Sequence, residues 1–199
     1  MTRLLVPTLV MLAFAGAAPA AVYTIDGNHT QVQFTYKHLG FSHLSGRLNQ
    51  VSGSFDFDPA KPARSSIDVQ IPMASLSTGV PKLDAHLSSP DFFDVEKFPT
   101  ARFKSNKVTV LGKGKLKVAG DLTIHGVTKP IVLDVTINKT GEHPMKKRAA
   151  AGFDASAMIN RSDFGVGGMV PMIDDQVRLN MSLEAQEPTK ELPAAQKAG

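Results

Sequence analysis

Hydrophobic and polar residues alternate with a period of two along most of the chain. In TQVQFTYKHL the side chains of Val32, Phe34 and Tyr36 fall on one face, and polar side chains fall on the other. The same alternation recurs in GSFDFD, SSIDVQIP, KLKVAGDLTIHG, KPIVLDVTIN and in residues 153–159 and 177–183. This period is typical of strands with one buried and one solvated face. It predicts about eight or nine antiparallel strands, separated by Gly, Pro, Asn and Asp.

One short helix interrupts this pattern. Pro81 near a first turn, the run KLDAHL and the break at Pro90 predict a helical insert over about residues 79–94. No long helix that would serve a parallel crossover is visible in the sequence. Gly126 to Pro130, within IHGVTKP, mark the tightest turn between two strands and predict a β-hairpin.

An antiparallel sheet of this length has to close or fold over to protect its edges. Closure at about eight strands leaves room for packed side chains or for one small ligand. The inward positions combine phenylalanines with small aliphatic residues, and such a mixture either fills a core or lines an apolar slot. Phe92 and Phe93 in the insert likewise either plug the barrel end or line a pocket mouth. The pattern by itself leaves both questions open.

The two ends of the chain depart from the strand pattern. Residues 1–20 combine an early charge, an apolar run and an A-x-A site, which predict a cleaved secretory signal peptide. We expect one domain over residues 21–186 and, because EPTKELPAAQKAG is rich in Pro, Ala and charge, a disordered tail over residues 187–199. The chain has no cysteine, so the domain depends on its core rather than on disulfides. A formal net charge of +4 is too small to indicate a nucleic-acid partner.

Candidate catalytic and metal-ligating residues form no recognisable motif. The six histidines show neither H-x-H nor H-E-x-x-H spacing, and a zinc site needs three or four convergent ligands. Asp84 and His86 lie two residues apart on the expected helix, where side chains at that spacing do not face each other. There is no cysteine nucleophile and no G-x-S-x-G elbow. We therefore expect no catalytic residue, no metal site and no cofactor.

Four blocks of the sequence together resemble the YceI-like family of periplasmic polyisoprenoid-binding proteins. They are YKHLGFSHLSGRL, KLDAHLSSPDFFDVEKFPTARFKS, GDLTIHGVTKPIVLDV and GFDASAMINRSDFGV, and they occur in the family's order. The resemblance runs from about Tyr23 to Gln186. It implies an all-β fold, an extended antiparallel eight-stranded barrel of lipocalin-like shape, in the periplasm. It also implies an elongated cavity for a long-chain amphiphile, such as a polyprenyl phosphate, an isoprenoid quinone or a fatty amide.

The family blocks and the alternation together select residues for this cavity, and with the resemblance Phe92 and Phe93 are expected at its mouth. The expected ligand-binding residues are Phe34, Tyr36, Phe55, Phe57, Phe92, Phe93, Phe103, Leu122, Ile124, Leu133, Val135, Ile159 and Phe164. His38 and Arg161 are expected to orient the head group. Family members often carry RD-x-HLRS where this chain has KLDAHLSS. Two cationic contacts are therefore missing, which favours a neutral quinone or amide head group over a phosphate.

Three functions from different classes agree with these features. The first is an exported lipid-binding protein, not an enzyme, which contacts a membrane transiently and for which the family type suggests a homodimer. The second is a redox accessory or enzyme that acts on a bound isoprenoid quinone, favoured by the histidines near strand ends. The third is a fully packed barrel that serves as an interaction module. This last alternative predicts a barrel without an internal cavity.

Overall fold

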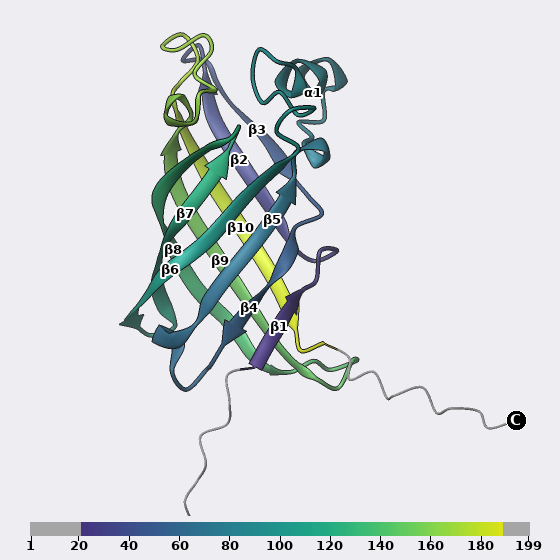
Figure 1. Ribbon diagram of the computed structural model, residues 1–199, viewed down its shortest axis with the longest axis vertical. Coiled ribbons are helices and arrows are strands. Elements are labelled where there is room, and N and C mark those ends of the chain that lie inside the picture. Colours follow the sequence, from purple (N-terminus) through teal and green to yellow (C-terminus); the bar gives the residue numbers. More distant parts are fainter. Residues whose placement is uncertain (1–20, 189–199) are drawn as a thin grey trace, which may run out of the picture.

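The computed structural model describes residues 21–188, so the predicted signal peptide and most of the predicted tail lie outside the described residues. These residues form an antiparallel sheet wrapped into a barrel, with one helix beside its upper end (Figure 1). The elements are β1 (Ala21–Ile25), β2 (Gln31–His38), β3 (Ser42–Leu48), β4 (Ser52–Phe57), β5 (Ser66–Pro72), α1 (Pro81–Ser88), β6 (Thr100–Gly112), β7 (Lys115–Ile124), β8 (Val127–Glu142), β9 (Ala149–Asn160) and β10 (Gln176–Gln186). Within residues 21–188 no helix combines the length and apolarity that a membrane span needs.

The barrel closes because β10 pairs with two different segments along one edge. Its first half pairs with β2, from Arg178 opposite Thr35 onward, and its last residues pair with β1, where Thr24 lies opposite Gln186. β1 and β2 therefore occupy one position in the ring, and β4 and β3, which pair with them, occupy the next. With β5 to β10 in sequence order, the described strands make a closed antiparallel barrel of eight positions. The predicted fold class is confirmed.

The wall of the barrel is incomplete between β3 and β5. β3 forms the free end of the strand order, and a single bridge, Arg47 opposite Ser77, ties it to the chain that leaves β5. The Ser75 hydroxyl adds a hydrogen bond to the carbonyl oxygen of Asn49 at 2.7 Å. The connection from β5 to β6 passes over this opening and carries α1, at the same end as the β2–β3 turn and the loop after β9 (Figure 1).

The helical insert follows its local sequence signals. Pro81 occupies the first turn of α1, where its missing N–H costs nothing. The Asp84 carboxylate accepts hydrogen bonds from the backbone N–H and the hydroxyl of Thr78, at 2.6 and 2.5 Å. Leu87 turns the buried face toward the barrel, and the helix ends at Ser88, two residues before Pro90. The prediction of a short helix within residues 79–94 is confirmed.

Two local details differ from the prediction. The hairpin between β7 and β8 exists, but its turn consists of His125 and Gly126, both with positive φ (51° and 73°), and Val127–Pro130 already belong to β8. A two-residue loop of this kind matches the twist of the flanking strands. The alternation of β6 is broken by register shifts at Ser105/Lys107 and Val110/Gly112. Such bulges hide a strand from a search for strict period two.

The end of the barrel at β1 and β4 is filled by aromatic side chains. Tyr23 stacks on Phe55 at 5.3 Å between ring centroids, and Phe153 meets Phe57 edge to face at 5.2 Å. Phe57 is 1% exposed, which makes it one of the largest fully buried side chains. The offset and edge-to-face geometries are those that aromatic pairs prefer. This cluster therefore closes the lower end of the barrel as packed core.

Replacing Phe57 with Ala should lower the free energy of unfolding by about 3–5 kcal/mol, because it removes a buried ring from a packed cluster. Urea unfolding followed by circular dichroism measures the loss. The matched control is Phe41→Ala, since Phe41 is 91% exposed and should change stability by less than about 0.5 kcal/mol. Equal effects of the two substitutions would contradict the assignment of the aromatic cluster to the core.

Candidate functional site

An apolar cavity of about 400 Å³ lies at the upper end of the barrel, beneath the helical insert. Strands, insert and the loop after β9 all contribute to its wall. The lining residues are Phe34, Tyr36, His38, Leu44, Leu48, Met73, Leu76, Leu83, His86, Leu87, Phe92, Phe93, Ala101, Ile124, Ile159, Arg161, Phe164, Val166, Met169, Ile173, Val177 and Leu179. Apart from His38, His86 and Arg161, these side chains are apolar or aromatic, so we call this space the outer cavity and expect it to favour a ligand with little polarity.

A second apolar cavity of about 150 Å³, the inner cavity, continues deeper into the barrel. Its wall includes Val32, Phe55, Phe57, Phe103, Val108, Leu116, Val118, Leu122, Leu133, Val135, Phe153, Leu179, Met181 and Leu183. Inward-facing residues pass from one cavity to the other along several strands, as from Ile124 to Leu122 on β7 and from Ala101 to Phe103 on β6. Leu179 lines both cavities. The two cavities therefore lie in series, and the fully packed barrel is not supported.

All thirteen expected ligand-binding residues face one of these cavities. Phe34, Tyr36, Phe92, Phe93, Ile124, Ile159 and Phe164 line the outer cavity, and Phe55, Phe57, Phe103, Leu122, Leu133 and Val135 line the inner one. The alternation and the family blocks together selected them, and their placement along the cavity walls agrees with that selection. Their contact with a ligand stays a prediction.

Two glycines make room for aromatic rings, one in the wall of each cavity. Gly46 lies opposite Phe34, and a Cβ atom at Gly46 would come within 2.3 Å of the Phe34 ring. A Cβ atom at Gly120 would come within 2.7 Å of the Phe103 ring. Both rings therefore lie against the wall over backbone that carries no side chain. The lumen stays open where two phenylalanines would otherwise have to project across it.

The insert supplies the mouth of the outer cavity. Phe92 and Phe93 are half-buried and line it, and His86 meets the Phe92 ring edge to face at 4.9 Å between centroids. A Cβ atom at Gly168 would lie 3.6 Å from Phe92, so the loop after β9 contacts the insert here. Of the two interpretations of the Phe pair, the structure favours the mouth over the plug. Asp84 is bound to Thr78 rather than to His86, as their spacing predicts.

Arg161 organises the loop at this mouth. Its guanidinium donates hydrogen bonds to the carbonyl oxygens of Val166, Gly168, Ile173 and Asp174, at 2.7 to 2.9 Å. These bonds use four of the five N–H donors of an arginine. Burial lowers the pKa of Arg161 below its ordinary value. Its placement at the mouth agrees with the prediction, but its bonds are to the loop and leave little for a head group.

Two other polar groups at the mouth are better placed for a ligand. His38 is half-buried, lines the outer cavity and pairs with Ile173 of the loop. Tyr36 also lines the outer cavity, and burial raises the pKa of its hydroxyl. Within residues 21–188 this hydroxyl makes no hydrogen bond. The Tyr36 hydroxyl therefore remains a donor that can face a bound molecule.

Several cavity residues escaped the sequence analysis. Leu44 and Leu48 on β3 alternate around Gly46 in SHLSGRL. This short period-two signal could have identified them as inward-facing residues. Met169 and Ile173 lie on an irregular loop, where no periodicity marks the side of a residue. They enter the cavity wall because tertiary contacts fold the loop over the barrel end.

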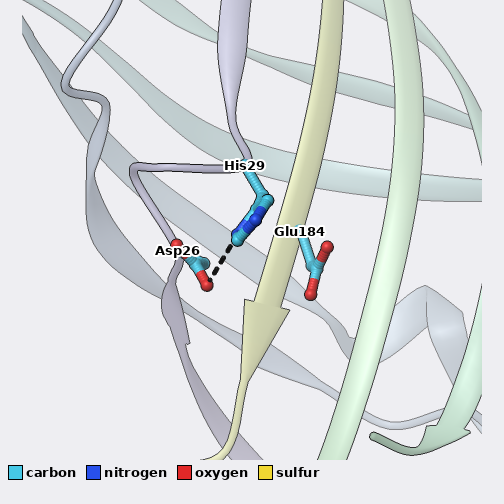
Figure 2. Close-up of side chains that lie close together, drawn as sticks. All are labelled: Asp26, His29 and Glu184. Carbon is cyan, nitrogen blue, oxygen red and sulfur yellow. Dashed lines mark ion pairs between the residues drawn. The ribbon is translucent and has the colours of Figure 1, made fainter. Parts of the chain in front are cut away.

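Away from the cavities, three side chains that can ligate a metal lie close together on the β1–β2 turn and β10 (Figure 2). The candidate ligand atoms of Asp26, His29 and Glu184 lie within 4.8 Å of one another. The Asp26 carboxylate is 3.1 Å from His29 Nδ1 and 3.0 Å from Lys146 Nζ. A divalent cation would have to displace that ammonium group. The cluster is therefore better described as an ion-pair network than as a metal centre.

His143 borders this network, but its tautomer prevents it from acting as a fourth ligand. Its Nδ1 accepts hydrogen bonds from the backbone N–H groups of Met145 and Lys146, both at 3.2 Å. The proton of the neutral ring must then sit on Nε2, which faces Glu184 Oε1 at 3.5 Å. A metal would need the lone pair of that same nitrogen.

Fold and cavity together define a closed antiparallel barrel with an apolar interior and a helical insert over its open end. The chain belongs to the YceI-like domain family, which matches residues 23–185. A UPF0312 protein of Pseudomonas savastanoi pv. phaseolicola is 45% identical over 162 residues, covering 80% of this chain and 84% of that protein.

Solved structures agree with this family. BcnA of Burkholderia cenocepacia is 27% identical with a TM-score of 0.73, covering 80% of this chain and 98% of BcnA. A polyisoprenoid binding domain from Saccharophagus degradans, implicated in plant cell wall breakdown, has a TM-score of 0.63 over 85% of this chain and 99% of that domain. At 16% identity, this second likeness concerns the fold.

Replacing Asp26 with Asn should destabilise the fold at neutral pH. Burial by itself would raise the pKa of Asp26, but hydrogen bonds from His29, Lys146 and the Asn28 N–H, with the charge of Lys146, lower it to about 2. A folded-state pKa below the unfolded value stabilises the protein above the unfolded pKa, and this stabilisation is lost as the pH falls through the folded value. We expect a loss of about 1–2 kcal/mol at pH 7 that shrinks between about pH 4 and pH 2.

Urea unfolding of wild type and Asp26→Asn across this pH range measures the difference. Asp121→Asn is the matched control, because Asp121 is exposed on β7 and should have little effect. A difference that stays constant from neutral to acid pH would contradict the ion-pair role of Asp26.

Proposed function

We propose that this protein is an exported lipid-binding protein that holds the tail of a long-chain amphiphile in the outer and inner cavities. The observation that carries the proposal is the continuous apolar lining from the mouth beneath the insert to the aromatic cluster at the other end. Two cavities in series suit a molecule that is long and narrow. The likeness in fold to a polyisoprenoid binding domain supports the same class of ligand.

The driving force for binding would be hydrophobic burial. Removing apolar surface from water is favourable by about 25 cal/mol per Å². A tail of several isoprene units exposes hundreds of Å², so the gross gain is on the order of 10 kcal/mol before the costs of ordering the chain. No hydrogen bond to the tail is needed. Walls made almost entirely of apolar side chains are therefore sufficient to hold the tail.

The head group would lie at the mouth and be neutral. Where the family pattern places an arginine, this chain has Leu83, whose side chain lines the outer cavity. The guanidinium of Arg161 is already bonded to four carbonyl oxygens. Tyr36 and His38 can each donate or accept a hydrogen bond there. A quinone or an amide fits these partners better than a phosphate, which favours charged donors.

Export rests on the pattern of residues 1–20, and we propose the periplasm as the site of action. An exported binding protein without a catalytic motif is suited to carry, store or sense its ligand. The ion-pair network of Asp26 lies outside the cavities and gives no support to an enzyme that acts on the bound molecule.

Organic extraction and mass spectrometry of protein purified from its own host test this proposal. We expect a stoichiometric long-chain amphiphile in the wild type and little or none in Phe34→Glu, because the substitution places a charge in the apolar wall. Leu44→Trp is a second variant, which adds apolar volume to the wall of the outer cavity and should also lower the lipid content.

Met145→Glu is the matched control, since Met145 is 82% exposed and borders neither cavity. This variant should retain the wild-type content of lipid. A protein that is purified empty, and that does not take up added quinones or fatty amides, would refute the proposal. Thermal unfolding of each variant separates loss of ligand from loss of fold.

A further inference from the structure

Exposed apolar side chains gather at the mouth of the outer cavity. Of the twelve large hydrophobic side chains that remain exposed among the described residues, five occur on two neighbouring loops at this end, the β2–β3 turn and the loop after β9. They are Leu39, Phe41, Met169, Val170 and Met172, which we call the rim patch. Phe41 is 91% exposed and Met172 is 59% exposed. Keeping apolar side chains of this size in water is unfavourable, so burying them against an apolar partner would lower the free energy.

The two loops form one surface because the structure ties them together. His38, at the end of β2, bridges to Ile173, and the Asp174 N–H donates to the carbonyl oxygen of Lys37 at 3.1 Å. Arg161 holds the loop after β9 from beneath through its four carbonyl contacts. The rim patch is thus presented on a fixed frame. Figure 1 shows both loops at the end of the barrel where α1 lies.

The rim patch is continuous with the outer cavity. Met169 belongs to both, since it is 49% exposed and also lines the cavity. The adjacent Gly168 lies against Phe92 of the insert, which lines the mouth from the other side. An apolar molecule can therefore pass from the rim patch to the cavity along apolar side chains.

We propose that the rim patch docks on the surface of a lipid bilayer and inserts Phe41 and Met172 between the lipids. This inference rests on the proposed function, because a cargo of low solubility resides in a membrane and has to enter through this mouth. A second copy of the chain is the less suitable occupant. The rim patch has five exposed apolar residues, whereas a stable protein interface uses about 20–30 residues a side.

The charges beside the rim patch indicate how it binds. Lys37 is exposed at the end of β2, and Asp163 is exposed at the start of the loop after β9. Because charges of both signs occur at this end, ionic attraction to an anionic membrane contributes little, and apolar insertion has to supply the affinity. Binding to an uncharged bilayer should therefore occur and should depend weakly on salt.

The test is sedimentation of the purified protein with vesicles of pure phosphatidylcholine, at low and high salt. We expect binding that persists at high salt, and a loss of about tenfold or more in Phe41→Ser, since each large apolar side chain contributes at least one factor of ten. Met172→Ser is the second variant. Met145→Ser is the matched control, because Met145 is 82% exposed in the β8–β9 connection, away from the rim patch.

Ligand content by extraction is measured on the same samples. Phe41→Ser loaded with ligand should retain it, because Phe41 lies outside both cavities, so loss of docking is distinguished from loss of ligand binding. Absence of vesicle binding in the wild type, or equal binding by Phe41→Ser and Met145→Ser, would overturn the docking surface even if lipid binding stands. Concentration-dependent dimerisation that is lost in Phe41→Ser would assign the rim patch to a second copy instead.

Discussion

The rest of this structure depends on the point at which β10 changes its partner from β2 to β1. The change is centred on one residue: the Asp26 N–H donates to the carbonyl oxygen of Glu184 at 2.9 Å, and the Glu184 N–H donates to the Thr30 hydroxyl at 3.2 Å. Between these two bonds the chain leaves the sheet and returns as β2. Buried backbone N–H groups need hydrogen-bond partners where a sheet is interrupted. Here the Thr30 hydroxyl supplies the partner of the Glu184 N–H, which makes the break possible. The Asp26 network then fixes the turn from outside.

This break gives the two ends of the barrel different properties. Below it, β1 and β4 are short, lie in the closed ring and bring Tyr23, Phe55 and Phe57 together as packed core. Above it, β2 and β3 occupy the same two positions of the ring, and β3 lacks a neighbouring strand on one side. The insert covers that side and leaves space beneath it. The same interruption therefore produces the packed end and the hollow end.

Alternation was sufficient to predict the fold class and the inner face, since Phe34, Leu122 and Ile124 all point inward at the expected period. Alternation could not distinguish a filled barrel from a hollow one, because the free space inside depends on where the inward-facing aromatic rings lie. Gly46 and Gly120 decide this by giving Phe34 and Phe103 a place on the wall, and their role is visible once the strands are paired.

Long-range contacts between irregular segments were beyond prediction from sequence. The hydrogen bonds of Arg161 to four carbonyl oxygens join parts of one loop, and the local sequence RSDFG does not predict them. The turn expected from Gly126 begins one residue earlier, at His125, because a two-residue turn with positive φ accepts histidine beside glycine. The Asp26 cluster brings Glu184 to Asp26 and His29 from a distant part of the chain, so the residue spacing of known metal motifs could not predict it.

The aromatic cluster at the lower end makes the barrel a tube with one entrance. A long molecule inside such a tube can have only one polarity: its tip meets Phe57 and Phe153, and its opposite end stays beneath Phe92. It must leave by reversing the path of its entry, so the first part to re-emerge is the last that went in. A molecule with polar groups at both termini would have to bury one of them against benzene rings. On the proposed function, the blind end would exclude a cargo with a polar tip, because desolvation of that tip would have no compensating partner there, whatever the entrance accepts.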